Sequence, residues 1–130
     1  MKANATALSG LLWGIAILPS LAAAGTAVAQ TEAAIATVHY ACAHGKTLTA
    51  QYFDGPARTA PDGRPIPGGR VVLTLEGSRT LTLPQTLSGS GIRYANSDGT
   101  MVFWSKGDTA FIEEGASHTV TYEGCNATNK

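Results

Sequence analysis

The feature that most limits the possible folds is a succession of short runs in which apolar and polar residues alternate. In TVHYACA, the residues Val38, Tyr40 and Cys42 fall on one face of an extended chain, and KTLTAQYF alternates in the same way. Further runs follow in the order RVVLTLEG, RTLTLPQ, IRYA, TMVFWS, TAFIEE and HTVTYEG. β-Branched and aromatic residues dominate these runs, and glycine-containing turns separate them. We therefore expect an all-β fold, a small eight-stranded antiparallel barrel, with a two-sheet sandwich as the alternative.

Residues 1–29 have the pattern of a secretory signal peptide. Lys2 gives a positive start, the run ALSGLLWGIAIL is apolar, and Ala27-Val28-Ala29 matches the small-residue pattern of a cleavage site. The apolar run is short for a bilayer span, which makes an uncleaved membrane anchor the weaker alternative. We expect cleavage after Ala29, with Ala24 as a second possibility, and a periplasmic or secreted protein without a stable membrane anchor.

The remaining residues, 30–130, are enough for one small domain. Its two cysteines, Cys42 and Cys125, lie towards opposite ends of this region. An oxidising compartment favours a disulfide between them, which would stabilise the fold by roughly 4 kcal/mol because it closes a long loop. Two free thiols are the alternative.

Charge and ligand patterns exclude several classes of partner. Without Lys2, eight Lys and Arg residues stand against nine Asp and Glu residues, a formal charge of −1. The sequence has no basic stripe of the kind that binds nucleic acid. His39, Cys42 and His44 are close in sequence but do not share one face of a strand, so they make a poor metal site. We expect no nucleic-acid partner, no metal and no cofactor.

One segment interrupts the alternating runs: DGPARTAPDGRPIPGG, residues 54–69. Its prolines and glycines are unfavourable inside a sheet, so we expect a long exposed loop without regular strand. The loop could be a tolerated insertion or could contact a partner.

The stretch SGSGIRY, residues 88–94, admits three interpretations: a catalytic serine, a phosphate-binding loop, or a loop that docks on a partner. A nucleophile elbow requires G-x-S-x-G before a helix, but Ser88 occupies the position of the first glycine and no helix follows. A serine nucleophile also needs a base near Ser90, and His39, His44 and His118 lie far away in the sequence. A phosphate-binding loop would need a helix and a suitably spaced lysine. A plain tight turn is the remaining alternative to a docking loop.

The chain resembles the bacterial inhibitors of c-type (chicken-type) lysozyme, known in membrane-bound and periplasmic forms. The resemblance rests on YACAHGKTLTAQYF (40–53), LSGSGIRYA (87–95) and FWSKGDTA (103–110), and it extends to Cys125. It implies an eight-stranded antiparallel barrel. It also implies a protein that is not an enzyme and that inhibits c-type lysozyme by inserting a loop into the active-site cleft.

The resemblance further implies which residues meet lysozyme. Ser90 of the S-G-x-x-Y motif and Lys106 of the W-x-K-G motif would contact the catalytic carboxylates, with Tyr94 beside them. Gly89 and Gly91 would let the loop bend and approach closely. The plainer alternatives are a turn residue for Ser90, a solvated lysine for Lys106 and a core residue for Tyr94. The stretch ANSDGTM (95–101) is longer than in typical members of the family, which could change the shape of the inserting tip.

Three neighbouring residues have structural roles in this interpretation. Phe103 and Trp104 lie on opposite faces of one strand, so at least one belongs to the core. Arg93 should face solvent or pair with an acidic neighbour.

A second class of function is a periplasmic barrel that binds a small ligand or a cell-wall component. Such a barrel should enclose an apolar cavity, whereas an inhibitor of this size should be filled with side chains.

Overall fold

The computed structural model describes residues 10, 14–17, 25 and 32–129. Residues 31–130 form one compact unit, which contains all of the elements described below. The expected signal peptide, residues 1–29, lies almost entirely outside the described residues. Within the described part of the chain, no helix has the length and apolar character needed to cross a membrane.

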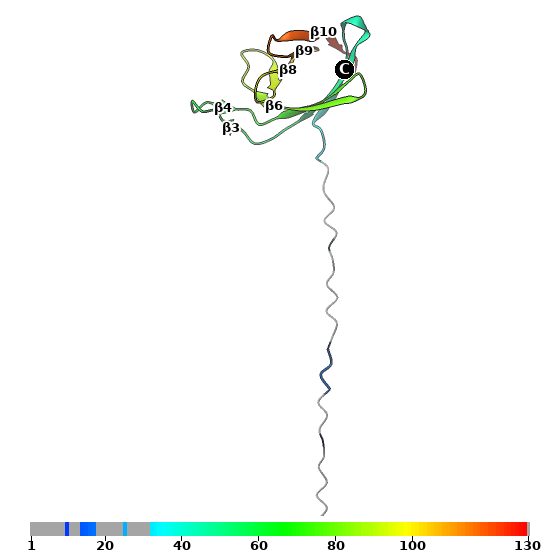
Figure 1. Ribbon diagram of the computed structural model, residues 1–130, viewed down its shortest axis with the longest axis vertical. Coiled ribbons are helices and arrows are strands. Elements are labelled where there is room, and N and C mark those ends of the chain that lie inside the picture. Colours follow the sequence, from blue (N-terminus) through cyan, green and yellow to red (C-terminus); the bar gives the residue numbers. More distant parts are fainter. Residues whose placement is uncertain (1–9, 11–13, 18–24, 26–31, 130) are drawn as a thin grey trace, which may run out of the picture. The chain divides into compact units, whose positions relative to one another are not determined.

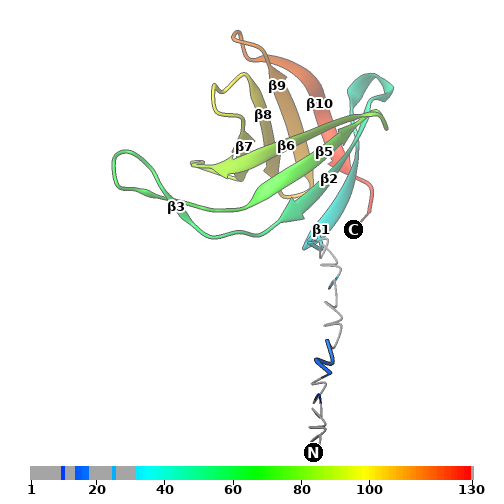
Figure 2. The same cartoon turned by 60° about the horizontal axis from the view of Figure 1, so that its bottom comes forward.

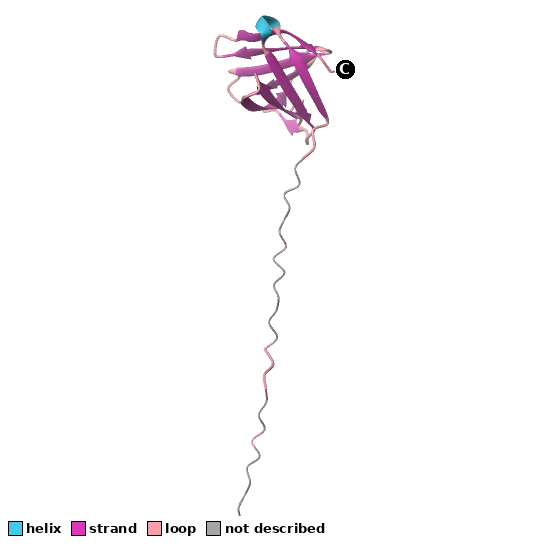
Figure 3. Cartoon of the chain, turned by 90° about the vertical axis from the view of Figure 1, so that its right-hand side faces the viewer, coloured by secondary structure: helices cyan, strands magenta, loops and turns pink. Residues whose placement is uncertain are grey.

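Eight strands close into an antiparallel barrel, which confirms the predicted fold class (Figures 1 and 3). Around the barrel the strands follow the order β1-β10-β9-β8-β7-β6-β5-β2. The short turn η1, shown in cyan in Figure 3, is the one helical element among the described residues. The elements are β1 (Ala36–Ala41), η1 (Ala43–Gly45), β2 (Thr47–Phe53), β3 (Arg58–Thr59), β4 (Pro65–Ile66), β5 (Arg70–Leu75), β6 (Arg79–Thr86), β7 (Ile92–Ala95), β8 (Met101–Lys106), β9 (Thr109–Glu114) and β10 (Thr119–Ala127).

The proline- and glycine-rich segment differs from the prediction in one respect. Its residues are mostly exposed, as expected, but it contains the strands β3 and β4, which pair with each other as a separate ribbon. This ribbon projects from the barrel as an arm (Figure 2). A two-stranded ribbon has only edge strands, so a proline such as Pro65 costs it no interior hydrogen bond. The expectation of a segment without strand was therefore wrong.

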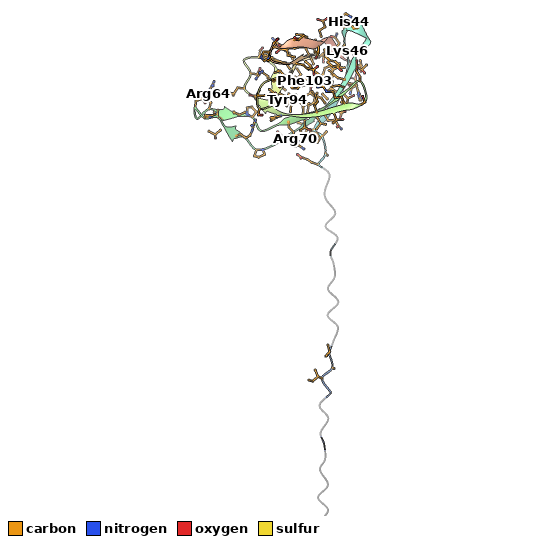
Figure 4. The ribbon with its side chains drawn as sticks, viewed as in Figure 1. His44, Lys46, Arg64, Arg70, Tyr94 and Phe103 are labelled. Carbon is orange, nitrogen blue, oxygen red and sulfur yellow. A yellow bond between two sulfur atoms is a disulfide. The ribbon has the colours of Figure 1, made fainter. Side chains whose placement is uncertain are left out.

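The barrel interior is filled with side chains. Phe103 on β8 is fully buried, and its ring lies 6.2 Å from that of Tyr40 and 6.1 Å from that of Tyr94 (Figure 4). Aliphatic side chains complete this core, including Leu48, Val71, Leu73, Leu75 and Ile112. On most strands the inward-facing residues are those that the two-residue alternation predicts, whereas register shifts on β10 break the alternation between Val120, Tyr122 and Cys125. A packed interior is what an inhibitor of this size requires, and it occupies the space that a ligand carrier would keep open.

The predicted disulfide joins Cys42 to Cys125, so the alternative of two free thiols is wrong. Cys42 follows β1, and Cys125 lies within β10, where it is fully buried. Because β10 pairs with both β1 and β9, the disulfide reinforces the seam where the first and last strands meet.

The antiparallel order gives the barrel two ends. We call the near end the one that carries the segments 54–69, 87–91 and 107–108, which follow β2, β6 and β8. The far end carries the turns 76–78, 96–100 and 115–118, which follow β5, β7 and β9.

Candidate functional site

The near end brings the two sequence motifs together. Ile92, at the start of β7, pairs with Ser105 near the end of β8. Gly91 therefore lies across from Lys106, and a Cβ atom built on Gly91 would be 3.2 Å from the Lys106 Cβ. Ser90 and Lys106 thus lie at the ends of neighbouring strands, although they are distant in sequence.

Of the two glycines predicted to shape this loop, Gly91 has the stricter requirement. Its φ of +66° is in the left-handed region, and a Cβ there would be only 2.5 Å from the Ser105 carbonyl oxygen. Gly89 has no positive φ, and a Cβ added there would meet no atom within 4 Å. The fold itself therefore does not require glycine at position 89.

The loop is held through the backbone of Ser90. The Ser90 carbonyl accepts hydrogen bonds from the Ser88 hydroxyl and, at 2.7 Å, from the Trp104 indole nitrogen. Within residues 32–129, the hydroxyl of Ser90 itself has no hydrogen-bond partner, and the residue is exposed. The loop is therefore fixed while its side-chain donor stays available to a partner.

The side chain of Trp104 lies on the outer surface of the barrel, where two neighbouring side chains hold it. Its ring stacks on Phe111 at 5.9 Å, and the Arg93 guanidinium lies over it at 5.8 Å. Of Phe103 and Trp104, Phe103 is the one in the core. Arg93 was expected to face solvent or to pair with an acidic residue, and it stacks on the Trp104 ring instead. The bond from Trp104 to the Ser90 carbonyl was not predicted, because no local pattern signals a contact between a loop and a strand that follows later.

Lys106 differs from the other described cations. It is exposed at the end of β8, and its carbonyl accepts a 2.9 Å hydrogen bond from the Thr109 hydroxyl, which fixes the turn. Among the described residues, Lys106 is the one lysine or arginine whose charged group has no partner within the protein. The others interact as follows: Lys46 with the Thr121 carbonyl, Arg58 with the Gln85 carbonyl, Arg64 with Asp62, Arg70 with Glu32, Arg79 with Glu114 and Arg93 with Trp104.

Tyr94 lies inside the barrel and is a core residue, which was the alternative to a surface position beside Ser90. It is 4% exposed and packs against Tyr52 and Phe103. Burial, with a smaller contribution from Tyr52, raises the pKa of Tyr94 to about 12. Burial also raises the pKa of Tyr40, whose hydroxyl shares a 3.0 Å hydrogen bond with that of Tyr52. Tyr94 thus supports the site from below and is not placed beside Ser90 on the surface.

A cleft of about 310 Å³ opens next to Ser90 and Lys106, and we call it the near cleft. Tyr94 and Ser105 are its buried members on β7 and β8, while Ile35 and Ile92 are exposed. The full lining is Ile35, Ala36, Val38, Tyr40, Tyr52, Ile92, Tyr94, Ser105 and Gly107.

The structure gives no support to a serine hydrolase. A nucleophilic Ser90 would need a histidine within hydrogen-bond reach of its hydroxyl. Each histidine pairs elsewhere: His39 with Thr49 at 2.9 Å, His44 with Glu123 at 3.2 Å and His118 with Glu113 at 3.4 Å.

The longer stretch 95–101 lies away from the loop that carries Ser90. Its turn, residues 96–100, lies at the far end, whereas Ser90 and Lys106 lie at the near end. The pairing of Ile92 with Ser105 fixes their relative position independently of this turn.

Comparison with known proteins now adds to this geometry. The family model described as "Membrane-bound lysozyme-inhibitor of c-type lysozyme" matches residues 40–121, a range that includes both motifs. A relative from Yersinia enterocolitica, named "Membrane-bound lysozyme inhibitor of C-type lysozyme", is 52% identical over 44 residues, which cover 34% of this chain and 35% of the relative. A relative of the same name from Cupriavidus necator is 31% identical over 80 residues, which cover 62% of this chain and 54% of the relative. The matches thus span about half or less of these relatives' length, and no solved structure matches.

Proposed function

Because this chain belongs to the family of membrane-bound lysozyme inhibitors of c-type lysozyme, we propose that it inhibits a c-type lysozyme by occupying the active-site cleft. It acts as a binding protein and performs no catalysis. The observation that carries this proposal is the exposed Lys106 ammonium without an internal partner, on a residue packed against Gly91 and thus near Ser90, whose hydroxyl is also free.

The chemistry of the target fits these two groups. A retaining glycosidase holds two carboxyl groups about 5 Å apart around the bond that it cleaves. The ammonium of Lys106 can pair with both carboxylates, and the hydroxyl of Ser90 can donate a hydrogen bond to one of them. The closed cleft removes water from these contacts, so they are stronger than ion pairs on an open surface.

The loop is prepared for this role before the partner arrives. The Trp104 hydrogen bond holds the Ser90 backbone, and the left-handed Gly91 places that backbone against β8. A rigid loop loses little conformational entropy on binding, which favours affinity. The side chains of Ser90 and Lys106 need break no internal hydrogen bond or ion pair before they bind.

We place this activity in the bacterial cell envelope. Residues 1–29 carry the pattern of a secretory signal, and no cysteine near the cleavage region offers a site for lipid attachment. The mature protein is thus a periplasmic or secreted form, whereas both relatives are named as membrane-bound. There it would protect peptidoglycan from lysozyme.

A turbidity assay tests the function directly. The purified protein is titrated against hen egg-white lysozyme, and against a panel of other c-type lysozymes, acting on a suspension of bacterial cell walls. We expect loss of lysis that is stoichiometric with the added protein. Undiminished lysis by every c-type lysozyme at large molar excess would reject the proposal and favour a ligand-binding barrel.

A further inference from the structure

The exposed apolar side chains of the barrel are not evenly distributed. Among residues 32–129, the large aliphatic side chains that remain exposed are Ile35 at 68%, Ile92 at 42% and Val120 at 45%. Two of the three, Ile35 and Ile92, line the near cleft. Single exposed aliphatic residues are ordinary, but two that line one cleft form a coherent apolar surface.

Both isoleucines are held in place by the backbone. The Ile35 N–H donates a 2.8 Å hydrogen bond to the Tyr52 carbonyl, which extends the pairing of β1 with β2 by one residue. Ile92 opens β7 and pairs with Ser105. This backbone pairing fixes the position of both residues at the near cleft.

The near cleft lies beside the charged contact, although Ser90 and Lys106 do not line it. Ser105 and Gly107 line it and are the two neighbours of Lys106, while Ile92 follows Ser90 by two residues. A partner that reaches Ser90 and Lys106 therefore comes close to the mouth of this cleft.

We propose that the near cleft is the apolar half of the lysozyme-binding surface and accepts an apolar side chain from the wall of the enzyme's active-site cleft. This inference rests on the proposed function and adds a second source of affinity to it. Covering Ile35 and Ile92 removes apolar surface from water, which is the main favourable term in protein association. Such an apolar patch beside a charged anchor is the usual organisation of a protein interface.

A second copy of this chain is a poorer occupant of the cleft. A two-fold contact through the near ends would bring the same surface of both copies together and would set Lys106 near its own symmetry mate. An acidic partner removes this repulsion, and the lysozyme active site is acidic.

The test compares three threonine substitutions by titration calorimetry against a c-type lysozyme. Threonine keeps the β-branched shape that strands favour, so Ile92→Thr and Ile35→Thr should leave the barrel folded. Val120→Thr is the matched control, because Val120 is as exposed as Ile92 but pairs with Glu113 towards the far end. We expect each isoleucine substitution to raise Kd about tenfold and the control to change it less than about twofold.

The heat-capacity change separates lost apolar burial from a disturbed loop. Burial of apolar surface makes the heat-capacity change of binding negative. The isoleucine substitutions should make it less negative, whereas Lys106→Ala should mainly weaken the dependence of Kd on salt. The same values for both classes of variant would overturn the assignment of the cleft.

Three other outcomes also decide the question. Wild-type binding that is weakened by Lys106→Ala but not by either isoleucine substitution would reject the apolar half and leave the proposed function standing. A fall in the melting temperature of the isoleucine variants without a change in Kd would show that these side chains stabilise the barrel and not the complex, and would reject the apolar half. No binding of lysozyme by the wild-type protein would reject both proposals.

Discussion

Charged side chains pair with one another at both ends of the barrel, but Lys106 at the near end stands apart from them. Arg79 pairs with Glu114 at 2.9 Å, the Thr121 hydroxyl donates to the same carboxylate, and Lys46 donates to the Thr121 carbonyl at 2.7 Å. Lys106 at the near end has no such partner among the described residues. The contrast shows that this small fold can pair its charges internally, and the unpaired Lys106 is the residue on which the proposed lysozyme contact depends.

The titrating groups of the two ends differ as well. Burial alone would raise the pKa of Glu114 at the far end, but the hydrogen bond from Thr121 and the ion pair with Arg79 outweigh burial, and the pKa is lowered. Beneath the near end lie Tyr40 and Tyr94, both held neutral because burial raises their pKa values. Acid should therefore weaken the far end, and alkali should weaken the near end.

Separate substitutions of Lys106 at the near end and Lys46 at the far end should give the largest effect and should separate lysozyme binding from stability. Lys106→Ala should weaken lysozyme binding by about 2–5 kcal/mol, mainly through faster dissociation, because it leaves desolvated carboxylates without their cation. It should leave the free energy of unfolding unchanged. Lys46→Ala, the matched control, should do the reverse: binding unchanged and stability lowered by about 1 kcal/mol through loss of its hydrogen bond. Surface plasmon resonance and urea unfolding measure the two quantities, and equal binding by both variants would contradict the role of Lys106.

Alkaline pH should lower the stability of the barrel through the buried tyrosines beneath the near end. Tyr94 has a pKa near 10 in the unfolded chain and about 12 in the barrel, so between these values the unfolded chain loses a proton that the folded barrel keeps. Stability is therefore complete below pH 10 and falls by about 1.4 kcal/mol per pH unit up to pH 12 from this group alone. Urea unfolding of the wild type and of Tyr94→Phe across this range should give a shallower decline for the variant. Parallel curves would show that Tyr94 does not titrate in this way.

Ser90→Ala should have an intermediate effect that is confined to binding. The lost hydrogen bond to a lysozyme carboxylate should cost on the order of 1–3 kcal/mol. The loop should keep its shape, because its anchors are the Ser90 carbonyl and Trp104 rather than the Ser90 hydroxyl. Inhibition equal to that of the wild type in the turbidity assay would reduce Ser90 to a turn residue.

Arg79→Ala should have the smallest effect and should act only at the far end. The Arg79 side chain is about half exposed, so its loss should lower stability by about 1 kcal/mol near neutral pH. Its ion pair helps to lower the pKa of Glu114, and that stabilisation is present above the ordinary glutamate pKa and is lost as the carboxylate is protonated. The stability difference between wild type and variant should therefore shrink towards acid pH, while lysozyme binding stays the same. Weaker lysozyme binding by this variant would contradict the separation of the two ends.

Much of the barrel could be predicted from the sequence, because its physical basis is local. A period of two residues separates the inward face from the outward face of each strand, and this placed Tyr40 and Leu48 in the core and identified the barrel strands. The disulfide followed from cysteine number and compartment.

The remaining features depend on contacts that no local pattern encodes. The β3–β4 ribbon was missed because prolines usually argue against strands, although a two-stranded ribbon tolerates them. The hydrogen bond from the Trp104 indole to the Ser90 carbonyl joins residues that come together only when β7 pairs with β8. The motif placed Tyr94 beside Ser90 and strand alternation allowed it in the core, and the structure has it buried in the barrel.

The seam between β1 and β10 also sets the timing of folding. Ala41 pairs with Asn126, so the barrel cannot close until almost the whole chain is available, whether it emerges from a ribosome or from an export channel. Hairpins such as β7–β8 can form early, but ring closure has to wait for the final strand, and folds dominated by such distant contacts form slowly. The barrel thus stays open until the last strand is available to pair with the first. It becomes a sealed barrel only when its last strand arrives and Cys125 can meet Cys42.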